Sequence, residues 1–285
     1  MSKPGIPQGT RDFTADVVRR RSYILNTIKN VFECYGFQPL ETPAMENLET
    51  LMGKYGEEGD RLIFKILNNG LNDPKNQDKA TEGFQKVLEG KSSSLLTERA
   101  LKYDLTIPFA RFVAMNHGQL TFPYKRYQIQ PVWRADRPQK GRYREFTQCD
   151  ADVVGSASLI NEIDLLNIYH TVFRRLGLKG YAIKINNRKI LSALSEQCGG
   201  AEWMTAITVA IDKLEKIGID KVKNELELKG LDSTKIAMVE RYLNIAGNNE
   251  QKLEKIKSFF KENAEAAQGI TELSYLLKHC GNINI

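Results

Sequence analysis

Apolar residues recur at helical spacing through residues 14–35 of the 285-residue chain. They lie three or four positions apart, Thr14 stands where an N-cap is expected, and Gly36 follows the last apolar positions. The pattern therefore predicts a helix that Thr14 caps and Gly36 ends. Other windows predict further elements by the same rules: extended runs at 38–42, 61–67, 95–97 and 181–186, and helices at 107–116 and 157–176.

Residues 124–133 alternate between apolar and polar side chains, as a strand does. Tyr127 belongs to the apolar face, whereas Gln128 and its polar neighbours belong to the other. Residues 146–154 are extended again, and the Arg-Pro-Gln-Lys-Gly sequence at 137–141 has turn chemistry. We therefore predict an antiparallel hairpin with a long basic tip.

The pattern of polar and apolar residues changes at two points along the chain. Residues 68–94 are polar, which favours a solvated surface insertion with a short helix near 80–89; a functional lid is the alternative. Beyond residue 188 the apolar spacing is helical throughout, so we expect an α+β domain at 1–188 and a small all-α domain at 189–285. Further helices of that second domain are expected at 232–246, 250–263 and 268–279.

Composition narrows the class of protein. No run of 18 apolar residues indicates a membrane span, and the first ten residues lack the apolar core of a signal peptide. The four cysteines are far apart and form no CxxC pair, which is typical of reduced thiols and argues against a zinc site. We therefore expect a cytoplasmic protein with no membrane partner and no structural metal.

The net charge of +6 is weak evidence for nucleic acid, but its distribution is more informative. Residues 125–144 hold seven Lys or Arg side chains against one acid, Asp136. Guanidinium groups at the base of a hairpin suit a polyphosphate, and Phe146 is placed to lie under a planar base. The alternative is a solvated strand with an incidental basic loop.

Polar residues on the returning strand form a second candidate site. Gln148, Asp150 and Asp152 have the same parity, so they face one side of the sheet and suit a cation such as an α-ammonium or imidazole group. Asp104 and Thr106 would share a face if their segment is extended. From these two residues alone, an N-cap arrangement before the following helix is the favoured interpretation.

The hairpin tip at 134–146 closely resembles motif 2 of the histidyl-tRNA synthetases, which are class II aminoacyl-tRNA synthetases. Its Arg-Pro-Gln-Lys-Gly-Arg-Tyr-Arg run is long and specific. Other segments agree in order: 9–13 is similar to the family's N-terminal signature, 35–50 looks like motif 1, and 101–108 and 148–152 resemble histidine-binding segments.

The resemblance covers residues 5–188 firmly and implies a class II synthetase-type antiparallel sheet flanked by helices, with motifs 1 and 2 in this part. Residues 189–285 match in position the helical insertion that follows motif 2. The sequence holds no counterpart of the family's motif 3 or anticodon-binding domain. We therefore expect a fragment of a histidine–tRNA ligase that is inactive, or nearly so, alone.

The same resemblance implies substrate roles for residues of this sequence. Arg134 is implied as the catalytic residue that bridges the substrate carboxylate and the α-phosphate of ATP, with Mg²⁺ entering alongside ATP. The residues implied to bind L-histidine, besides Arg134, are Asp104, Thr106, Gln148 and Asp152, the last on the α-ammonium group. The further residues implied to bind ATP are Asp136, Arg142 and, stacked on adenine, Phe146.

The implied partners are tRNA(His) and a second copy of the chain, which would pair through the motif 1 region. The residues implied to face the tRNA are Arg137, Gln139 and Arg144. One alternative is a synthetase-like regulatory protein that senses histidine, but the intact motif 2 arginines favour the ligase. Another is a generic nucleic-acid-binding module, which leaves the acidic clusters without a role.

Overall fold

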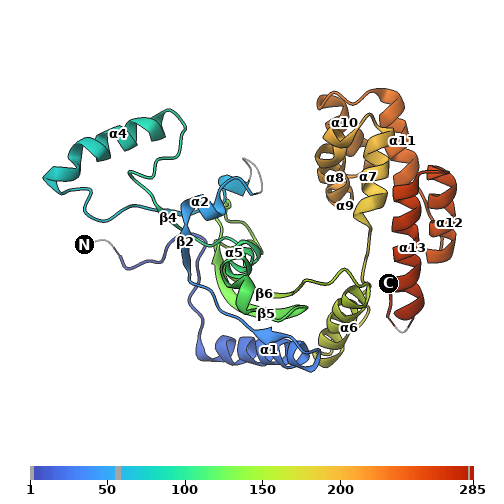
Figure 1. Ribbon diagram of the computed structural model, residues 1–285, viewed down its shortest axis with the longest axis horizontal. Coiled ribbons are helices and arrows are strands. Elements are labelled where there is room, and N and C mark those ends of the chain that lie inside the picture. Colours follow the sequence, from blue (N-terminus) through green and yellow to red (C-terminus); the bar gives the residue numbers. More distant parts are fainter. Residues whose placement is uncertain (1–2, 55–58, 282) are drawn as a thin grey trace. The chain divides into compact units, whose positions relative to one another are not determined.

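The computed structural model describes residues 3–54, 59–281 and 283–285 (Figure 1). The chain forms two compact units, one comprising residues up to 156 together with 171–177, the other comprising 157–170 and 178–285. The second unit begins before the boundary expected near residue 188. The reason is that Leu166 packs in one apolar cluster with Leu276 and Ile283, so the first part of helix α6 belongs with the C-terminal helices.

A long hairpin is the centre of the first unit. Strands β5 (Tyr124–Trp133) and β6 (Glu145–Val154) pair antiparallel, with Arg126 opposite Asp152 and Gln130 opposite Gln148. The short strand β1 (Gln38–Pro39) pairs parallel with the other edge of β5. The predicted hairpin is therefore confirmed, and the α+β fold class with it.

Helices cover both faces of this hairpin. Helix α1 (Ala15–Cys34) lies alongside it (Figure 1), and its Phe32 ring stacks 5.5 Å from the Tyr127 ring. Helix α5 (Thr106–Asn116) lies on the opposite face, where its Phe109 stacks 6.2 Å from Tyr124. Because both faces are covered, the polar face of β5 is buried as well, and Gln128 is 0% exposed.

A second sheet has the order β2-β4-β3, formed by β2 (Met45–Asn47), β4 (Arg99–Leu101) and β3 (Lys65–Ile66). The backbone N–H of Trp133 donates to the carbonyl oxygen of Lys102 at 3.0 Å, which ties β4 to the end of β5. Two expected strands are corrected here. The run at 61–67 shortens to the two residues of β3, although the carbonyl oxygen of Phe64 still accepts a backbone hydrogen bond from Leu101 of β4 at 3.0 Å. Residues 95–96 lie in a turn and residue 97 belongs to no strand.

Short helices complete the first unit. The insertion at 68–94 contains a helix longer than the one expected near 80–89, and Figure 1 shows this helix, α4, standing off from the sheets.

The predicted N-cap residue Thr14 precedes α1 but its side chain makes no capping hydrogen bond, and Gly36 follows the helix with φ +79°. The remaining bounds are α2 (Leu48–Leu51), η1 (Pro74–Asn76), α4 (Gln77–Leu88) and η2 (His117–Gln119).

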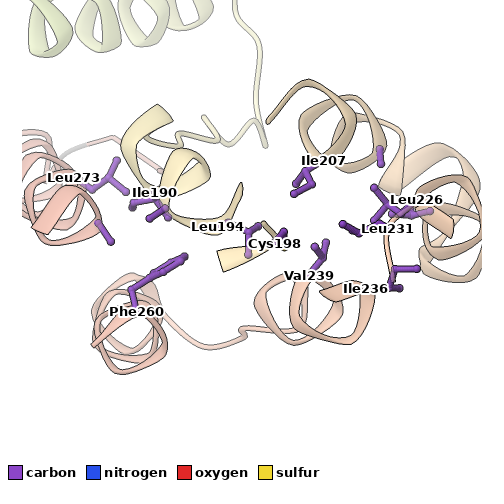
Figure 2. Packing of buried hydrophobic residues seen from close by; sticks show 14 residues of the cluster. Ile190, Leu194, Cys198, Ile207, Leu226, Leu231, Ile236, Val239, Phe260 and Leu273 are labelled. Atoms are coloured by element: carbon purple, nitrogen blue, oxygen red, sulfur yellow. The ribbon is translucent and has the colours of Figure 1, made fainter. Parts of the chain in front are cut away.

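The second unit is helical. Its core centres on α7, whose Leu194 and the adjoining Cys198 lie between the side chains of the flanking helices (Figure 2). The expected strand at 181–186 forms no ladder, although Ile183 donates one backbone hydrogen bond to Asn284 at 2.8 Å. The helices are α6 (Ile160–Arg175), α7 (Arg188–Gln197), η3 (Ala201–Trp203), α8 (Met204–Asp212), α9 (Leu214–Ile217), α10 (Ile219–Leu228), α11 (Ser233–Leu243), α12 (Asn249–Phe260) and α13 (Ala264–His279).

Candidate functional site

A pocket of about 560 Å³ lies at the base of the hairpin tip. All four residues expected to bind ATP line it: Arg134, Asp136, Arg142 and Phe146. The Arg134 guanidinium lies 5.1 Å from the Phe146 ring centroid, and Arg142 Nη1 lies 3.6 Å from Asp136 Oδ1. The pocket therefore combines an aromatic face with four guanidinium groups, since Arg11 and Arg21 line it as well. This is chemistry suited to an adenine ring and a polyphosphate.

The N-terminal segment helps to build this pocket. Arg144 donates its backbone N–H to the carbonyl oxygen of Gly9 at 2.8 Å, and the Arg11 guanidinium lies 3.3 Å from the Tyr143 ring centroid. Arg144 also donates from Nε to the carbonyl oxygen of Asp136 at 3.1 Å. The segment at 9–13 thus contacts the returning side of the loop, although it lies far from motif 2 in sequence.

The segment before α5 shows which of the two interpretations of Asp104 and Thr106 is right. Asp104 is buried and its Oδ1 accepts a hydrogen bond from the N–H of Ile107 at 3.2 Å, as a capping residue does. Thr106 is the first residue of α5 and is exposed. The N-cap position itself is Leu105, so Asp104 pairs with the first turn of α5 from one residue before the cap. The shared extended face is wrong because the chain turns into the helix between Asp104 and Thr106.

Two arginines join this segment to the hairpin. Arg134 donates from Nε to the carbonyl oxygen of Tyr103 at 2.9 Å, and Arg126 donates from Nη2 to that of Leu105 at 3.2 Å. Arg126 Nη2 also lies 2.7 Å from Asp152 Oδ2. The structure therefore brings the segment 103–106 (the Asp104 segment) close to Gln148, Asp150 and Asp152 of β6 (the polar row).

The pKa of Asp150 is shifted by burial and by the charged groups around the Asp104 segment and β6. Burial raises the pKa of its carboxyl group, and the negative charges of Asp152 and Asp104 raise it further, whereas Arg126 and Arg134 oppose the shift. Burial also lowers the pKa of Arg126, against the effect of Asp152. Three carboxylates and two guanidinium groups thus act on one another across a single site.

Unsatisfied polar atoms single out the same face. Among the described residues, six buried side-chain nitrogen or oxygen atoms have no hydrogen-bond partner, and five of these belong to the polar face of β5 and β6. The five are Arg126 Nε and Nη1, Gln128 Oε1, Gln148 Oε1 and Asp152 Oδ2, the last of which has the ion pair with Arg126 instead. Because buried polar groups are normally paired, this concentration indicates a site for a polar ligand.

Two residues of β5, and Lys102 directly after β4, were not predicted as site residues. Arg126 and Gln128 are fully buried on the polar face, and Lys102 is 1% exposed. Lys102 Nζ donates to the carbonyl oxygen of Thr42 at 2.9 Å and to Gln130 Oε1 at 2.7 Å, while burial lowers its pKa. Arg126 and Gln128 lie opposite Asp152 and Asp150 in the hairpin and so share a face with them. This alternation along the strand was the sequence signal that could have identified them.

The residues expected to face tRNA differ in their surroundings. Arg137 and Gln139 are exposed at the hairpin tip, whereas Arg144 is half-buried and holds the loop. Within the part of the chain that the structure describes, no group of three or more His, Cys, Asp or Glu side chains is placed to hold a metal ion. The same described residues include no helix that is both long and apolar enough to cross a membrane.

Comparisons with known proteins identify the family of this chain. The sequence profile of the family described as histidyl-tRNA synthetase matches residues 76–285. The histidine–tRNA ligase of Bacteroides fragilis is 52% identical over 276 residues, which are 97% of this chain and 60% of the relative. The crystal structure of histidyl-tRNA synthetase from Nostoc sp. PCC 7120 superposes with a TM-score of 0.77 at 30% identity, covering 99% of this chain and 59% of that one.

A more distant structure shares the fold alone. It comes from Bacillus halodurans, is described as an ATP phosphoribosyltransferase regulatory subunit/histidyl-tRNA synthetase, and superposes with a TM-score of 0.75 at 18% identity, covering 99% of this chain and 66% of that one. The sheet, its flanking helices and the motif 2 hairpin define a class II aminoacyl-tRNA synthetase fold. The chain belongs to the histidyl-tRNA synthetase family. It spans about 60% of the length of the curated relatives it matches.

Proposed function

We propose that this chain supplies the histidine- and ATP-binding surfaces of a histidine–tRNA ligase, an enzyme that activates L-histidine with ATP and transfers it to tRNA(His). The observation that carries the proposal is that two ligand sites adjoin at Arg134. Arg134 lines the pocket that also contains Asp136, Arg142 and Phe146. The same arginine donates a hydrogen bond to the carbonyl oxygen of Tyr103, directly before Asp104.

In this proposal the polar row binds the amino acid. Gln148 Oε1 is an acceptor without a protein donor, and 34% of the Asp152 side chain is exposed, so an ammonium or imidazole N–H would pair with both. Asp104, which precedes α5, and Thr106, the first residue of α5, are proposed to contact the histidine as well. A site that pairs its buried acceptors with these N–H groups rejects analogues that lack them.

Arg134 is the proposed catalytic residue. The histidine carboxylate attacks the α-phosphorus of ATP, pyrophosphate leaves, and the guanidinium stabilises the negative charge that develops between the two substrates. Asp136 and Arg142 hold the nucleotide, Phe146 lies against adenine, and Mg²⁺ arrives as part of the substrate ATP. Positioning and electrostatics account for the step, so no covalent intermediate with the protein is needed.

The wider assembly is part of the same proposal. Arg137, Gln139 and Arg144 would face the tRNA acceptor end in a cytoplasmic homodimer. The catalytic core with motifs 1 and 2 is proposed to lie within residues 1–188 and the insertion domain within 189–285, although the compact helical unit also includes 157–170 and 178–188. A dimer would pair two copies of the chain through the motif 1 region at 35–50.

Binding measurements test the proposal directly. Isothermal titration calorimetry should show binding of L-histidine and of Mg²⁺-ATP, and Arg134→Ala should weaken both by at least about tenfold, or about 1.4 kcal/mol. Lys140→Ala, in the same basic loop but outside the pocket lining, is the matched control and should change neither. Wild-type protein that binds neither substrate would contradict the proposal.

The regulatory alternative makes a different prediction. A histidine sensor needs the amino-acid site but has no use for the pocket of Asp136, Arg142 and Phe146, which is intact here. Histidine binding without any ATP binding would therefore favour the sensor over the ligase.

A further inference from the structure

Arg126 is completely buried on the polar face of β5, and its guanidinium makes three different contacts. Nη2 lies 2.7 Å from Asp152 Oδ2 and donates to the carbonyl oxygen of Leu105 at 3.2 Å. Its central carbon lies 4.2 Å from the ring centroid of Phe109. One side chain therefore connects β6, the segment before α5, and α5 itself.

The contact with Asp152 divides that carboxylate into an inner and an outer side. Oδ2 is buried against Arg126, yet 34% of the Asp152 side chain is exposed, so the exposure belongs to the remainder that includes Oδ1. Arg126 thus holds the carboxylate from inside the protein. The outer side stays available to a ligand.

Charge balance gives Arg126 a second effect. Asp104, Asp150 and Asp152 carry three negative charges when ionised, and Arg126 and Arg134 carry two positive charges. A net charge of about minus one matches one ammonium group on a ligand. Loss of Arg126 would leave the carboxylates repelling one another and Asp152 without its inner partner.

Neutral or shorter side chains cannot reproduce this arrangement. A planar guanidinium can contact a carboxylate and a carbonyl oxygen while its face lies against an aromatic ring, whereas a lysine ammonium is a point charge on a flexible stem. The contact with Leu105 matters because that residue lies between Asp104 and Thr106. Holding the Leu105 carbonyl therefore sets the distance between the Asp104 segment and Asp152.

We propose that Arg126 is a positioning residue for the amino-acid substrate, which locks Asp152 and the backbone at Leu105 in the relative placement that receives the α-ammonium group. This inference rests on the proposed function. Arg126 acts through Asp152 and does not touch the substrate.

The test compares substrates rather than overall stability. In Arg126→Lys the dissociation constant for L-histidine should rise at least about tenfold, which is about 1.4 kcal/mol, while that for Mg²⁺-ATP changes less than about twofold. Lys125→Gln, next in sequence and on the opposite face of β5, should change neither. Arg126→Lys with wild-type affinity for histidine, or with equal losses for both ligands, would overturn the inference.

A coupled variant keeps the test decisive if Arg126→Lys does not fold. Arg126→Gln combined with Asp152→Asn replaces the buried ion pair by neutral amides, which avoids an unpaired buried charge. Because Arg126 acts in part through Asp152, the double variant should lose less histidine affinity than the losses of Arg126→Gln and Asp152→Asn taken together, whereas fully additive losses would overturn the inference. Wild-type protein that does not bind histidine would instead refute the proposed function, so the two failures are distinguishable.

Discussion

Gly9 offers a test of how the N-terminal segment supports the ATP pocket. Its φ of +87° lies in the left-handed region, and a Cβ there would meet Arg144 Cγ at 2.8 Å and Pro138 Cγ at 3.0 Å. Gly9→Ala should therefore combine backbone strain with a clash. The strain amounts to about 1 kcal/mol, and the clash adds about 1–3 kcal/mol if the neighbours have to move.

Two other glycines separate these contributions. Gly36 has φ +79°, but no atom lies within 4 Å of the place that a Cβ would take, so Gly36→Ala should cost only the strain of about 1 kcal/mol. Gly5 has open space and no positive φ, so Gly5→Ala should be neutral within about 0.5 kcal/mol. The expected order of local destabilisation is Gly9, then Gly36, then Gly5.

Amide hydrogen exchange at Arg144 is the assay, because this N–H donates to the carbonyl oxygen of Gly9. In Gly9→Ala its exchange should accelerate at least about tenfold, since each 1.4 kcal/mol corresponds to a factor of about ten. The affinity for Mg²⁺-ATP should fall with it, because Arg144 also holds the backbone of Asp136. Unchanged protection of the Arg144 amide, or an equal effect from Gly36→Ala, would refute the reasoning.

Three further predictions concern packing and titration. Leu194→Ala, at a fully buried position in the helical unit, should lower the free energy of unfolding by about 2–5 kcal/mol. The control Leu228→Ala, at a position that is 88% exposed, should change it by less than about 0.5 kcal/mol. Equal effects of the two variants in denaturant titrations would contradict the assigned core. The raised pKa of Asp150 means that the folded state binds more protons than the unfolded state above the ordinary pKa of 3.8, so stability falls as pH rises through this window. Asp150→Asn should therefore raise the melting temperature at pH 7, with a gain that shrinks toward pH 3.8; a constant gain would exclude titration of Asp150 as its cause. Burial and the hydrogen bond to Glu33 raise the pKa of Tyr127 to about 12, so Tyr127→Phe should remove the last tyrosine to ionise in an alkaline absorbance titration, and an unchanged final step would contradict the assignment.

Much of the first unit followed from local sequence. The helix at 15–34 and the hairpin of β5 and β6 were predicted within a few residues, because periodicity over 10 to 20 positions reflects the element itself. The short strands were harder. Residues 95–97 and 181–186 have suitable side chains but form no ladder, since a strand also needs a partner, and the sequence of the strand does not contain it.

The candidate site divides in the same way. The motif 2 residues from Arg134 to Phe146 and the shared parity of Gln148 and Asp152 could be identified from sequence, because these features lie on one hairpin. The three-dimensional arrangement was needed to show that the polar face of β5 is buried beneath α5 and that Arg126 joins Asp152 to Leu105. Burial and pairing depend on which distant segment covers a side chain, and local periodicity carries no information about that neighbour.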